Sequence, residues 1–408
     1  MNVPYFRPSL DEREKDRVNA VLESGWLTSG KEVREFEAKF ADYLGVPHAV
    51  AVNSCTAALH LSLEALGVGP GDAVLVPTMT FAATAAVVRH LGARPVLVDC
   101  DPDTLCMDPV AMRRTLQAWR SDAVIKAVIP VHYGGYMADV DQISQIADEA
   151  GLTVVEDAAH ALPASYRDVG GNWRTVGSMS PLTCFSFYAN KCITTGEGGM
   201  VVSTDAELAE RTRTMSLHGL SKSAWSRFEA KGSWYYEVVA PGFKYNLTDL
   251  AAAIGIAQLE KADQFCEQRT RIAAMYTERL AEYAEFLETP QVGEDRMPSW
   301  HIYGIRLYLD QLCIDRAQFI EQLKERGIVT TVHWMPLHLH PYYRKTYGYR
   351  GTDCPVASKE WLRLISLPIF PSMTDAELDH VRASIGEVIA ANRRRRLHFV
   401  TATGTQGD

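Results

Sequence analysis

Residues 182–204 read LTCFSFYANKCITTGEGGMVVST and place one lysine, Lys191, between an apolar run and a glycine-rich turn. Residues 182–187 predict a short strand and residues 200–203 a second, with GEGG at 196–199 as the turn between them. A lysine held there and partly desolvated would have a lowered pKa and a nucleophilic amine able to form a Schiff base. A solvated loop lysine is the commoner use of such a position, and this stretch alone leaves both roles open.

Outward from this stretch, apolar runs alternate with helix-length segments as far as residue 258. This alternation is typical of an α/β domain with a mostly parallel sheet. We therefore predict a large α/β domain over residues 1–258, which also contains the N-terminal helices. Its further strands are predicted at residues 49–52, 73–76, 95–98, 125–131 and 152–155.

A connecting helix and a smaller C-terminal α+β domain are predicted over residues 259–392. Residues 393–408 begin with four arginines, Arg393 to Arg396, and end as a polar tail outside both domains. The elements predicted in the smaller domain are a strand at 301–307, a helix at 316–326, a strand at 329–332 and a last helix that begins near residue 374.

Two helix starts carry the sequence of a capping box, in which a hydroxyl and a carboxylate three residues later cap each other's backbone. One is Ser29 with Glu32, and the other is Thr374 with Glu377. Both pairs are predicted to begin helices.

The composition is that of a globular protein, with 47% hydrophobic and 22% charged residues among 408. A formal charge of −9 argues against a nucleic-acid-binding surface. No apolar run is long enough for a membrane span, and the charged N-terminus does not resemble a signal peptide. The eight cysteines form no CxxC pair, which favours reduced thiols. We expect a cytoplasmic protein with neither nucleic acid nor membrane as a partner.

A phosphate site is predicted where Asn53, Ser54, Cys55 and Thr56 follow a strand and open a helix. Hydroxyls and free amides at a helix N-terminus favour an anion, because the donors and the helix dipole act together. An ordinary N-cap explains the same residues equally well.

An acid and an aromatic residue follow two other predicted strands. Asp157 comes at the end of the strand at 152–155, and the carboxyl ends of parallel strands are where α/β folds place ligands. It could hold the proton on a bound heteroaromatic nitrogen, or simply cap a helix. Phe81 offers an aromatic face after another strand, although such a residue taken alone is more often core.

Two further patterns resemble sites without being sites. Gly67, Gly69 and Gly71 follow a helix and precede a strand, so we predict a turn and no dinucleotide loop. His333 and His338 lie close together in a loop, but no carboxylate or cysteine completes a metal set. We expect no metal site.

Several segments, in this order from about residue 5 to 390, resemble the DegT/StrS-type nucleotide-sugar aminotransferases, which are fold-type-I enzymes dependent on pyridoxal 5′-phosphate. No single segment carries the resemblance, which rests on their order. The segments are WLTSGKEVREFEAKFADYLGV, AVNSCTAALHLSLEALGVGPGD, VPTMTFAATA, VVEDAAHA, FSFYANKCITTGEGG, GFKYNLTDLAAAIG and VHWMPLHLHP.

The resemblance implies three catalytic residues. Lys191 would form the Schiff base with the cofactor and carry the proton, Asp157 would keep the ring nitrogen protonated, and His160 would lie near the ring's face or its phenolic oxygen. Asn246 would reach the phosphate of a partner chain, so an obligate homodimer with shared sites is expected. The other implied cofactor contacts are Cys55, Thr56, Ala57, Phe81 and Ser186.

The implied reaction moves nitrogen from L-glutamate to a keto-sugar linked to a nucleotide, with pyridoxamine phosphate as the intermediate form of the cofactor. Lys244 and Asn246 replace the commoner Asn and Arg of the family's GxNxR, and this variant resembles the branch acting on UDP- or dTDP-linked 4-keto-6-deoxy sugars. Lys244, His333 and His338 would then face the substrate. A 3-keto-sugar or cyclitol substrate, a non-catalytic cofactor-binding protein and a sugar dehydratase are alternatives. The dehydratase is disfavoured because those relatives have histidine where Lys191 stands.

Overall fold

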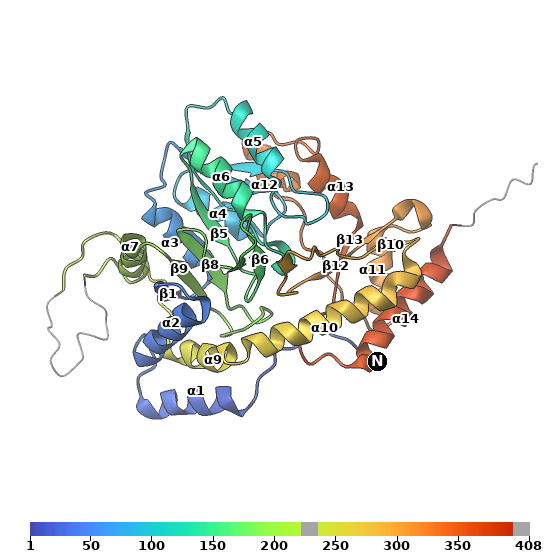
Figure 1. The fold of residues 1–408 in the computed structure, drawn as a ribbon, viewed down its shortest axis with the longest axis horizontal. Coiled ribbons are helices and arrows are strands. Elements are labelled where there is room, and N and C mark those ends of the chain that lie inside the picture. Colours follow the sequence, from blue (N-terminus) through green and yellow to red (C-terminus); the bar gives the residue numbers. More distant parts are fainter. Residues whose placement is uncertain (222–235, 395–408) are drawn as a thin grey trace, which may run out of the picture.

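A seven-stranded sheet organises the larger part of the structure, a computed structural model that describes residues 1–221 and 236–394 (Figure 1). The strand order is β1-β9-β8-β5-β4-β2-β3, and β9 runs antiparallel to both its neighbours while the other pairs are parallel. The predicted α/β class with a mostly parallel sheet is confirmed. The strands are β1 (His48–Val52), β2 (Asp72–Pro77), β3 (Arg94–Val98), β4 (Val124–Val128), β5 (Thr153–Asp157), β8 (Leu182–Ser186) and β9 (Gly199–Ser203).

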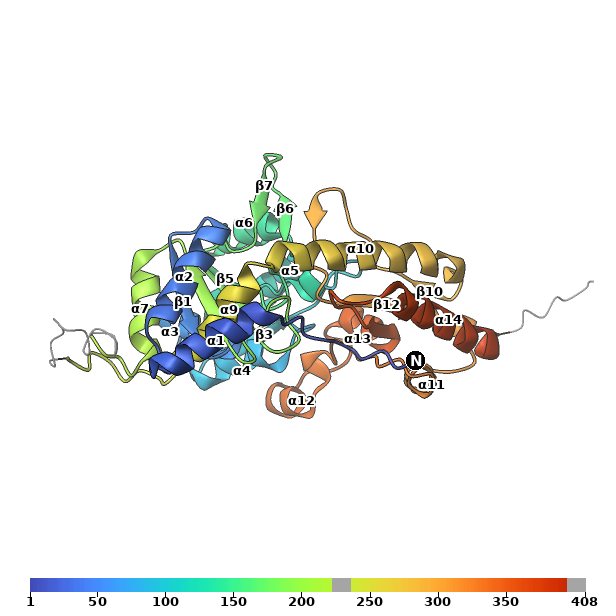
Figure 2. The same ribbon diagram turned by 90° about the horizontal axis from the view of Figure 1, so that it is seen from below.

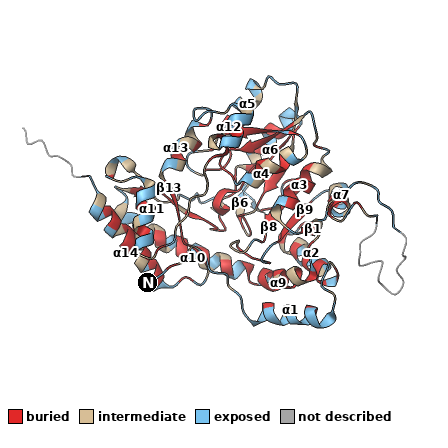
Figure 3. Ribbon diagram, turned by 180° about the vertical axis from the view of Figure 1, so that it is seen from behind, coloured by how far each residue is buried: buried red, intermediate tan, exposed pale blue. Residues whose placement is uncertain are grey.

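Helices cover both faces of this sheet, because successive side chains of a strand point to opposite sides. In β1, Val50 and Val52 join the core formed with α3, whereas Ala49 and Ala51 join the core formed with α2 and α9. Figure 3 shows the result as buried strands between helices whose outer faces are exposed. The helices of this part are α1 (Glu12–Ser24), α2 (Lys31–Leu44), α3 (Cys55–Ala65), α4 (Ala82–His90), α5 (Pro109–Ala118), α6 (Val140–Ala150), α7 (Ala206–Ser216) and α9 (Asp249–Leu259).

The smaller part is built on a three-stranded sheet, β10-β12-β13, which shares a core with α10, α11 and α14. No strand forms at 329–332, where Thr331 makes one isolated bridge with Ser366. The elements are α10 (Ala262–Leu280), β10 (Leu287–Glu288), β12 (Tyr303–Leu307), α11 (Arg316–Glu325), α12 (Pro341–Tyr347), α13 (Pro355–Arg363), β13 (Leu364–Leu367) and α14 (Asp375–Asn392), with 3₁₀ turns η2 (Ala281–Tyr283), η3 (Leu309–Gln311) and η4 (Leu337–Leu339). A further 3₁₀ turn, η1 (Tyr133–Gly135), lies in the larger part between β4 and α6.

Two segments cross between these parts. The chain begins beside α11, where Val3 pairs with Ile328, and only then runs to α1 (Figure 2). A third sheet, β11-β6-β7, joins β11 (Arg296–Met297) to a projecting hairpin of β6 (Ser165–Arg167) and β7 (Trp173–Thr175). The larger and smaller parts are therefore linked by these two segments as well as by the helix α10, which leads from one part to the other.

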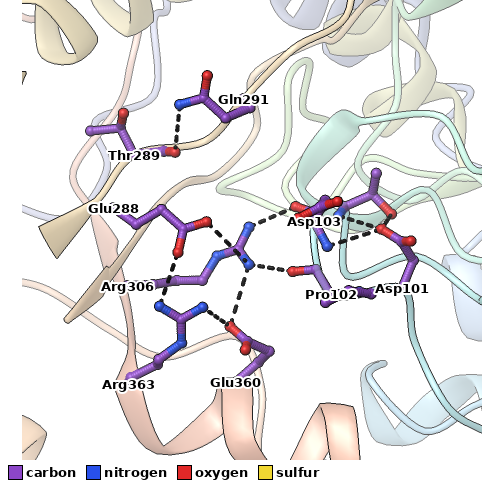
Figure 4. A network of polar contacts seen from close by, with 10 residues as sticks. Asp101, Pro102, Asp103, Glu288, Thr289, Gln291, Arg306, Glu360 and Arg363 are labelled. Carbon is purple, nitrogen blue, oxygen red and sulfur yellow. Dashed lines mark hydrogen bonds and ion pairs between the residues drawn. The ribbon is translucent and has the colours of Figure 1, made fainter. Parts of the chain in front are cut away.

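A buried arginine makes a further link between the two parts. Arg306 of β12 donates to the carbonyls of Pro102 and Asp103, the latter at 2.6 Å, and lies 3.3 Å from a carboxylate oxygen of Glu360 (Figure 4). Arg363 pairs with the same Glu360 carboxylate at 2.6 Å. Arg306 thus joins a loop of the large part to the small sheet.

One of the two predicted capping boxes is wrong. Ser29 does not cap α2, because its hydroxyl donates to the carbonyl of Leu247 at 2.5 Å. Asp249 caps the helix instead, accepting from the amides of Gly30 and Val33 at 2.7 and 3.1 Å. The other box, Thr374 with Glu377, is confirmed at the start of α14.

The glycines at 67, 69 and 71 lie between α3 and β2, as predicted for a turn. The division of the chain at residues 258 and 392 stays a prediction, and residues 395–408 of the predicted tail lie outside the described residues. Among the helices that the structure describes, none combines the length and apolarity needed to cross a membrane.

Candidate active site

A cavity of about 350 Å³ opens at the carboxyl ends of β2 and β5 and the amino end of α3. This volume is in the range of small-molecule sites in proteins. The cavity brings together eight residues predicted from sequence, which come from segments far apart in the chain. They are Cys55, Thr56, Phe81, Asp157, His160, Ser186, Lys191 and His333.

The floor of the cavity is the first turn of α3. Ser54 is the N-cap, and its hydroxyl accepts from the amide of Ala57 at 3.1 Å. The amides of a helix's first turn have no partners within the helix, so Cys55 and Thr56 present donors to the cavity. Gly199 packs against this turn so closely that a Cβ there would lie 2.5 Å from the carbonyl carbon of Ser54.

Asp157 ends β5 and is 5% exposed. Its carboxylate accepts from the hydroxyl of Thr84 at 2.9 Å and from the amide of Ala159 at 3.2 Å. Burial raises the pKa of this carboxyl, and the two hydrogen bonds oppose the rise. A cation opposite Asp157 would therefore complete its environment.

Lys191 lies in the loop after β8, and its amide donates to the carbonyl of Tyr188 at 2.9 Å. Its side chain lines the cavity, and burial lowers the pKa of the amine to about 8, against the opposing fields of Cys55 and Asp157. The loop closes through Gly196, which has a φ of 81°. The amine is thus held in place by backbone and is close to neutral at moderately alkaline pH.

Rings form one wall of the cavity. His160 stacks on Trp334 with ring centroids 5.1 Å apart, and Trp334 lies 6.4 Å from Phe81. The amide of Gly134 donates to Nδ1 of His160 at 3.3 Å, which leaves Nε2 as the protonated nitrogen of the neutral ring. Burial holds the pKa of His160 well below its usual range.

Four predicted site residues do not line this cavity. The amide of Ala57 is used by the N-cap, and His338 is fully buried between Thr78 and Ser358, each within 2.8 Å. Lys244 donates to Asn246 at 2.6 Å, and Asn246 donates to the hydroxyl of Ser29 at 2.6 Å. Asn246 instead borders a second hollow between α2 and α7.

Several residues of the cavity were missed from sequence, and three of them, Thr84, Asn190 and Trp334, bear on its chemistry. Thr84 lies inside α4 and Trp334 in a long loop, where no periodicity or spacing marks a site. Asn190, directly before the lysine, has a buried Oδ1 with no hydrogen-bond partner among the described residues. Its place beside Lys191 was the one signal available in the sequence.

The residues fit pyridoxal phosphate. A buried carboxylate suits its ring nitrogen, an amine of lowered pKa suits its aldehyde, and the α3 turn suits its phosphate. The close contact of Gly199 with Ser54 is the kind of approach that brings backbone amides up to a phosphate. Asn190 also lines the cavity, and its Oδ1 has no hydrogen-bond partner among the described residues.

Comparison with known proteins gives concordant findings. The model of the DegT/DnrJ/EryC1/StrS aminotransferase family matches residues 8–386. The spore coat polysaccharide biosynthesis protein SpsC of Bacillus subtilis is 43% identical over 388 residues, which are 95% of this chain and 97% of SpsC.

Solved structures agree with this. The protein Spr1654 of Streptococcus pneumoniae, described as a sugar aminotransferase, is 32% identical in its PMP form, with a TM-score of 0.87 over 96% of this chain and 100% of that one. Its PLP form is 31% identical with a TM-score of 0.86, over 96% and 99% of the two chains.

Proposed function

We propose, since this chain belongs to the DegT/DnrJ/EryC1/StrS aminotransferase family, that it moves an amino group from L-glutamate to a nucleotide-linked 4-keto-6-deoxyhexose. The product would be the 4-amino sugar, and the nucleotide dTDP or UDP. The observation that carries the proposal is that Lys191 and Asp157 line the same cavity as the N-terminal turn of α3. Sugar aminotransferase activity itself follows from membership of this family.

Pyridoxal 5′-phosphate is the cofactor, as in the PLP and PMP forms of Spr1654, and it supplies an electron sink for negative charge at the reacting carbon. Lys191 would hold the cofactor at its aldehyde carbon through Nζ. As a free amine, Nζ would carry the proton between the amino-bearing carbon of the donor and the cofactor's C4′ carbon, and in the second half-reaction between C4′ and the acceptor carbon of the sugar. A lysine whose pKa is about 8 suits both directions.

Asp157 holds a proton at the cofactor's ring nitrogen, and Thr84 keeps Asp157 ionised and oriented. Cys55 and Thr56 hold the phosphate through their amides, together with the hydroxyl of Ser186. His160 and Phe81 confine the ring. Each of these groups binds or orients, so the proton transfers are left to Lys191.

On the substrate side, His333 lines the cavity, with Nδ1 2.8 Å from the hydroxyl of Ser366. We assign it, with Lys244, to the sugar nucleotide. His338 is better placed to support the loop, because both its ring nitrogens already have partners.

Spectroscopy of the purified protein tests the activity. The holoenzyme should be yellow, lose its colour with L-glutamate, and regain it with a nucleotide-linked keto-sugar. A Lys191→Ala variant should lack the visible band of the lysine-bound cofactor, and a normal band would refute the lysine assignment. Failure to bleach with glutamate would favour a non-catalytic cofactor-binding protein.

The sugar is tested separately with the aminated cofactor form of the enzyme. Incubation with dTDP-4-keto-6-deoxyglucose should yield the 4-amino sugar by mass spectrometry. Turnover of a 3-keto isomer or a cyclitol ketone, without turnover of the 4-keto sugar, would end the C4 assignment.

We further propose a homodimer in which Asn246 of one protomer reaches the phosphate in its partner's site. Lys191→Ala and Asn246→Asp variants should each be inactive. Mixed under conditions that exchange subunits, they should recover about a quarter of wild-type activity, because half the dimers are mixed and each has one intact site. No recovery would place both residues in one site.

A further inference from the structure

The segment that leads into β12 lies directly against His160. The hydroxyl of Ser299 donates to the carbonyl of His160 at 2.5 Å. The amides of Ser299 and Ile302 donate to the carbonyls of Gly135 and Gly134, both at 3.1 Å. Gly134 in turn donates to Nδ1 of His160, so both the ring and the backbone of His160 are tied to this segment.

His301, at the centre of the segment, contacts the ring of His160. The two ring centroids are 4.3 Å apart at an interplanar angle of 46°, the shortest of the contacts described for the His160 ring. His301 is 4% exposed, and its Nδ1 is buried without a hydrogen-bond partner among the described residues. Since Nδ1 has no partner, it is the packing of the ring, and not a hydrogen bond at this atom, that ties His301 to His160.

The backbone that aims His301 is strained. Trp300 has a φ of 52°, a left-handed conformation that bulky L-residues rarely adopt. Its ring stacks on Tyr303 of β12 at 5.8 Å, which anchors the strained residue in the smaller core. Strain that persists next to a reactive centre is commonly part of how the site is held.

Burial, together with the charges around it, keeps His301 neutral. His160, Lys191, Arg269 and His333 face it from four different segments, and all four carry or can gain positive charge. Burial, with these fields, holds the pKa of His301 well below its usual range. Its contact with His160 is therefore a packing contact and not an ion pair.

We propose that His301 is a positioning residue that fixes the ring of His160 in the cavity wall, so that the alignment of His160 depends on the segment 299–302. The proposal rests on the proposed function, because it gives His160 a place beside the cofactor. It makes His301 a second connection of the smaller part of the molecule to the site, beside the loop of His333 and Trp334 that lines the cavity directly.

A double-mutant cycle tests this. His160→Ala, His301→Ala and the double variant are compared with the wild type in kcat, in KM, and in the pH midpoint of the visible band of the holoenzyme without substrates. His301→Ala should lower kcat by about tenfold to a hundredfold, as misplacement of a site group does, with KM within about twofold. The double variant should match His160→Ala in rate and midpoint, because His301 acts through His160.

His301→Phe keeps a ring in contact and should recover most of the loss, whereas a second loss as large as that of His301→Ala would overturn a packing role. Additive losses in the cycle, or an unchanged His301→Ala enzyme, would also overturn it. His60→Phe is the matched control, since His60 is buried, has an unpartnered Nε2 and contacts Phe243 away from the cavity. It should leave kcat and the midpoint unchanged.

The cycle separates this proposal from the function on which it rests. A wild type that does not transaminate would refute the proposed function. The pH midpoints of the four cofactor-loaded proteins would still report whether His301 acts through His160. Thermal unfolding of the four apoproteins identifies any variant that fails to fold. If that variant is His301→Ala, the His301→Phe protein decides alone, since a kcat near that of the wild type supports the packing role and a loss of tenfold or more overturns it.

Discussion

Two hydrogen bonds favour the charged form of Asp157. The carboxyl is buried and burial raises its pKa, while the hydroxyl of Thr84 opposes this most, followed by the amide of Ala159 and the charges of Lys191 and His132. The proposed role of Asp157 at the cofactor's ring nitrogen needs the charged form. A small change at Thr84 should therefore reach the chemistry without touching the cofactor.

Thr84→Val should lower kcat/KM by about tenfold to a hundredfold, because a hydrogen bond to a charged group contributes a free energy of that size. Loss of the donor raises the pKa of Asp157. The acidic limb of the pH profile should therefore move to higher pH. Thr84→Ser keeps the hydroxyl and should behave as wild type. An unmoved acidic limb in Thr84→Val would disprove the role of this bond.

Lys191 gives a prediction for cofactor uptake. The neutral amine is the nucleophile, so the rate at which apoenzyme takes up the cofactor should rise with pH as the amine loses its proton. The midpoint should lie near the lowered pKa of about 8, and not near the ordinary lysine value of 10.5. Stopped-flow absorbance measures it, and a midpoint above pH 10 would show that burial does not tune this amine.

At this scale the sequence singled out Lys191 and Asp157 as candidates but not Thr84 or Trp334. The first two follow predicted strands, and strand ends in α/β folds collect ligands. Thr84 is one threonine inside an apolar helix, and its role comes from β5 lying beside it in space. A pairing across 73 residues has no local signal.

Among the elements, the packing of β9 on α3 shapes the proposed phosphate site. The GEGG segment was predicted only as a turn between two strands, but the structure shows that its last glycine contacts the first turn of α3. A methyl at Gly199 would lie 2.5 Å from the carbonyl carbon of Ser54 and 2.7 Å from the amide nitrogen of Cys55. The contact is with backbone, which cannot rotate away.

Gly199→Ala should weaken cofactor binding by about tenfold or more, because the added methyl must displace the turn that holds the phosphate. Equilibrium dialysis of the cofactor measures the change. Gly69→Ala is the control, since no heavy atom lies within 4 Å of its would-be Cβ. Equal affinities for the two variants would contradict this role of Gly199.

The two helix starts show where a local pattern holds and where it fails. Thr374 and Glu377 cap α14 because nothing distant competes for their side chains. Ser29 has the same local pattern, but its hydroxyl is used by Leu247, and Asp249 supplies the cap from 219 positions away. Tertiary contacts override a cap when they offer a better acceptor.

For the whole molecule, Arg306 is the buried cation that joins the two parts (Figure 4). Its guanidinium reaches two carbonyls of the large part and the buried Glu360 of the small one. Removing it would take the donor from both carbonyls and one of its two arginine partners from the buried Glu360. The cost of such a loss is larger than the worth of the pair itself.

Arg306→Leu should lower the free energy of unfolding by about 3–5 kcal/mol, as loss of one member of a buried pair does. Urea denaturation of the apoprotein measures it. Arg382→Leu, which removes an exposed pair with Glu282, should change stability by less than about 1 kcal/mol. Similar losses in both variants would show that Arg306 does not link the two parts.

The sequence by itself determined the α/β class and most strands, because alternation is a property of short segments, and it offered Lys191 and Asp157 as candidates for the site. The order of the motifs pointed to the family. Only the tertiary structure decided that Lys191 is a cavity lysine and not a solvated one, since that depends on β5, α3 and the loop of Trp334 enclosing it. It also decided the partner of Asp157 and the contact of His301 with His160. Burial and distance between remote segments are set by packing, and no stretch of LTCFSFYANKCITTGEGGMVVST contains them.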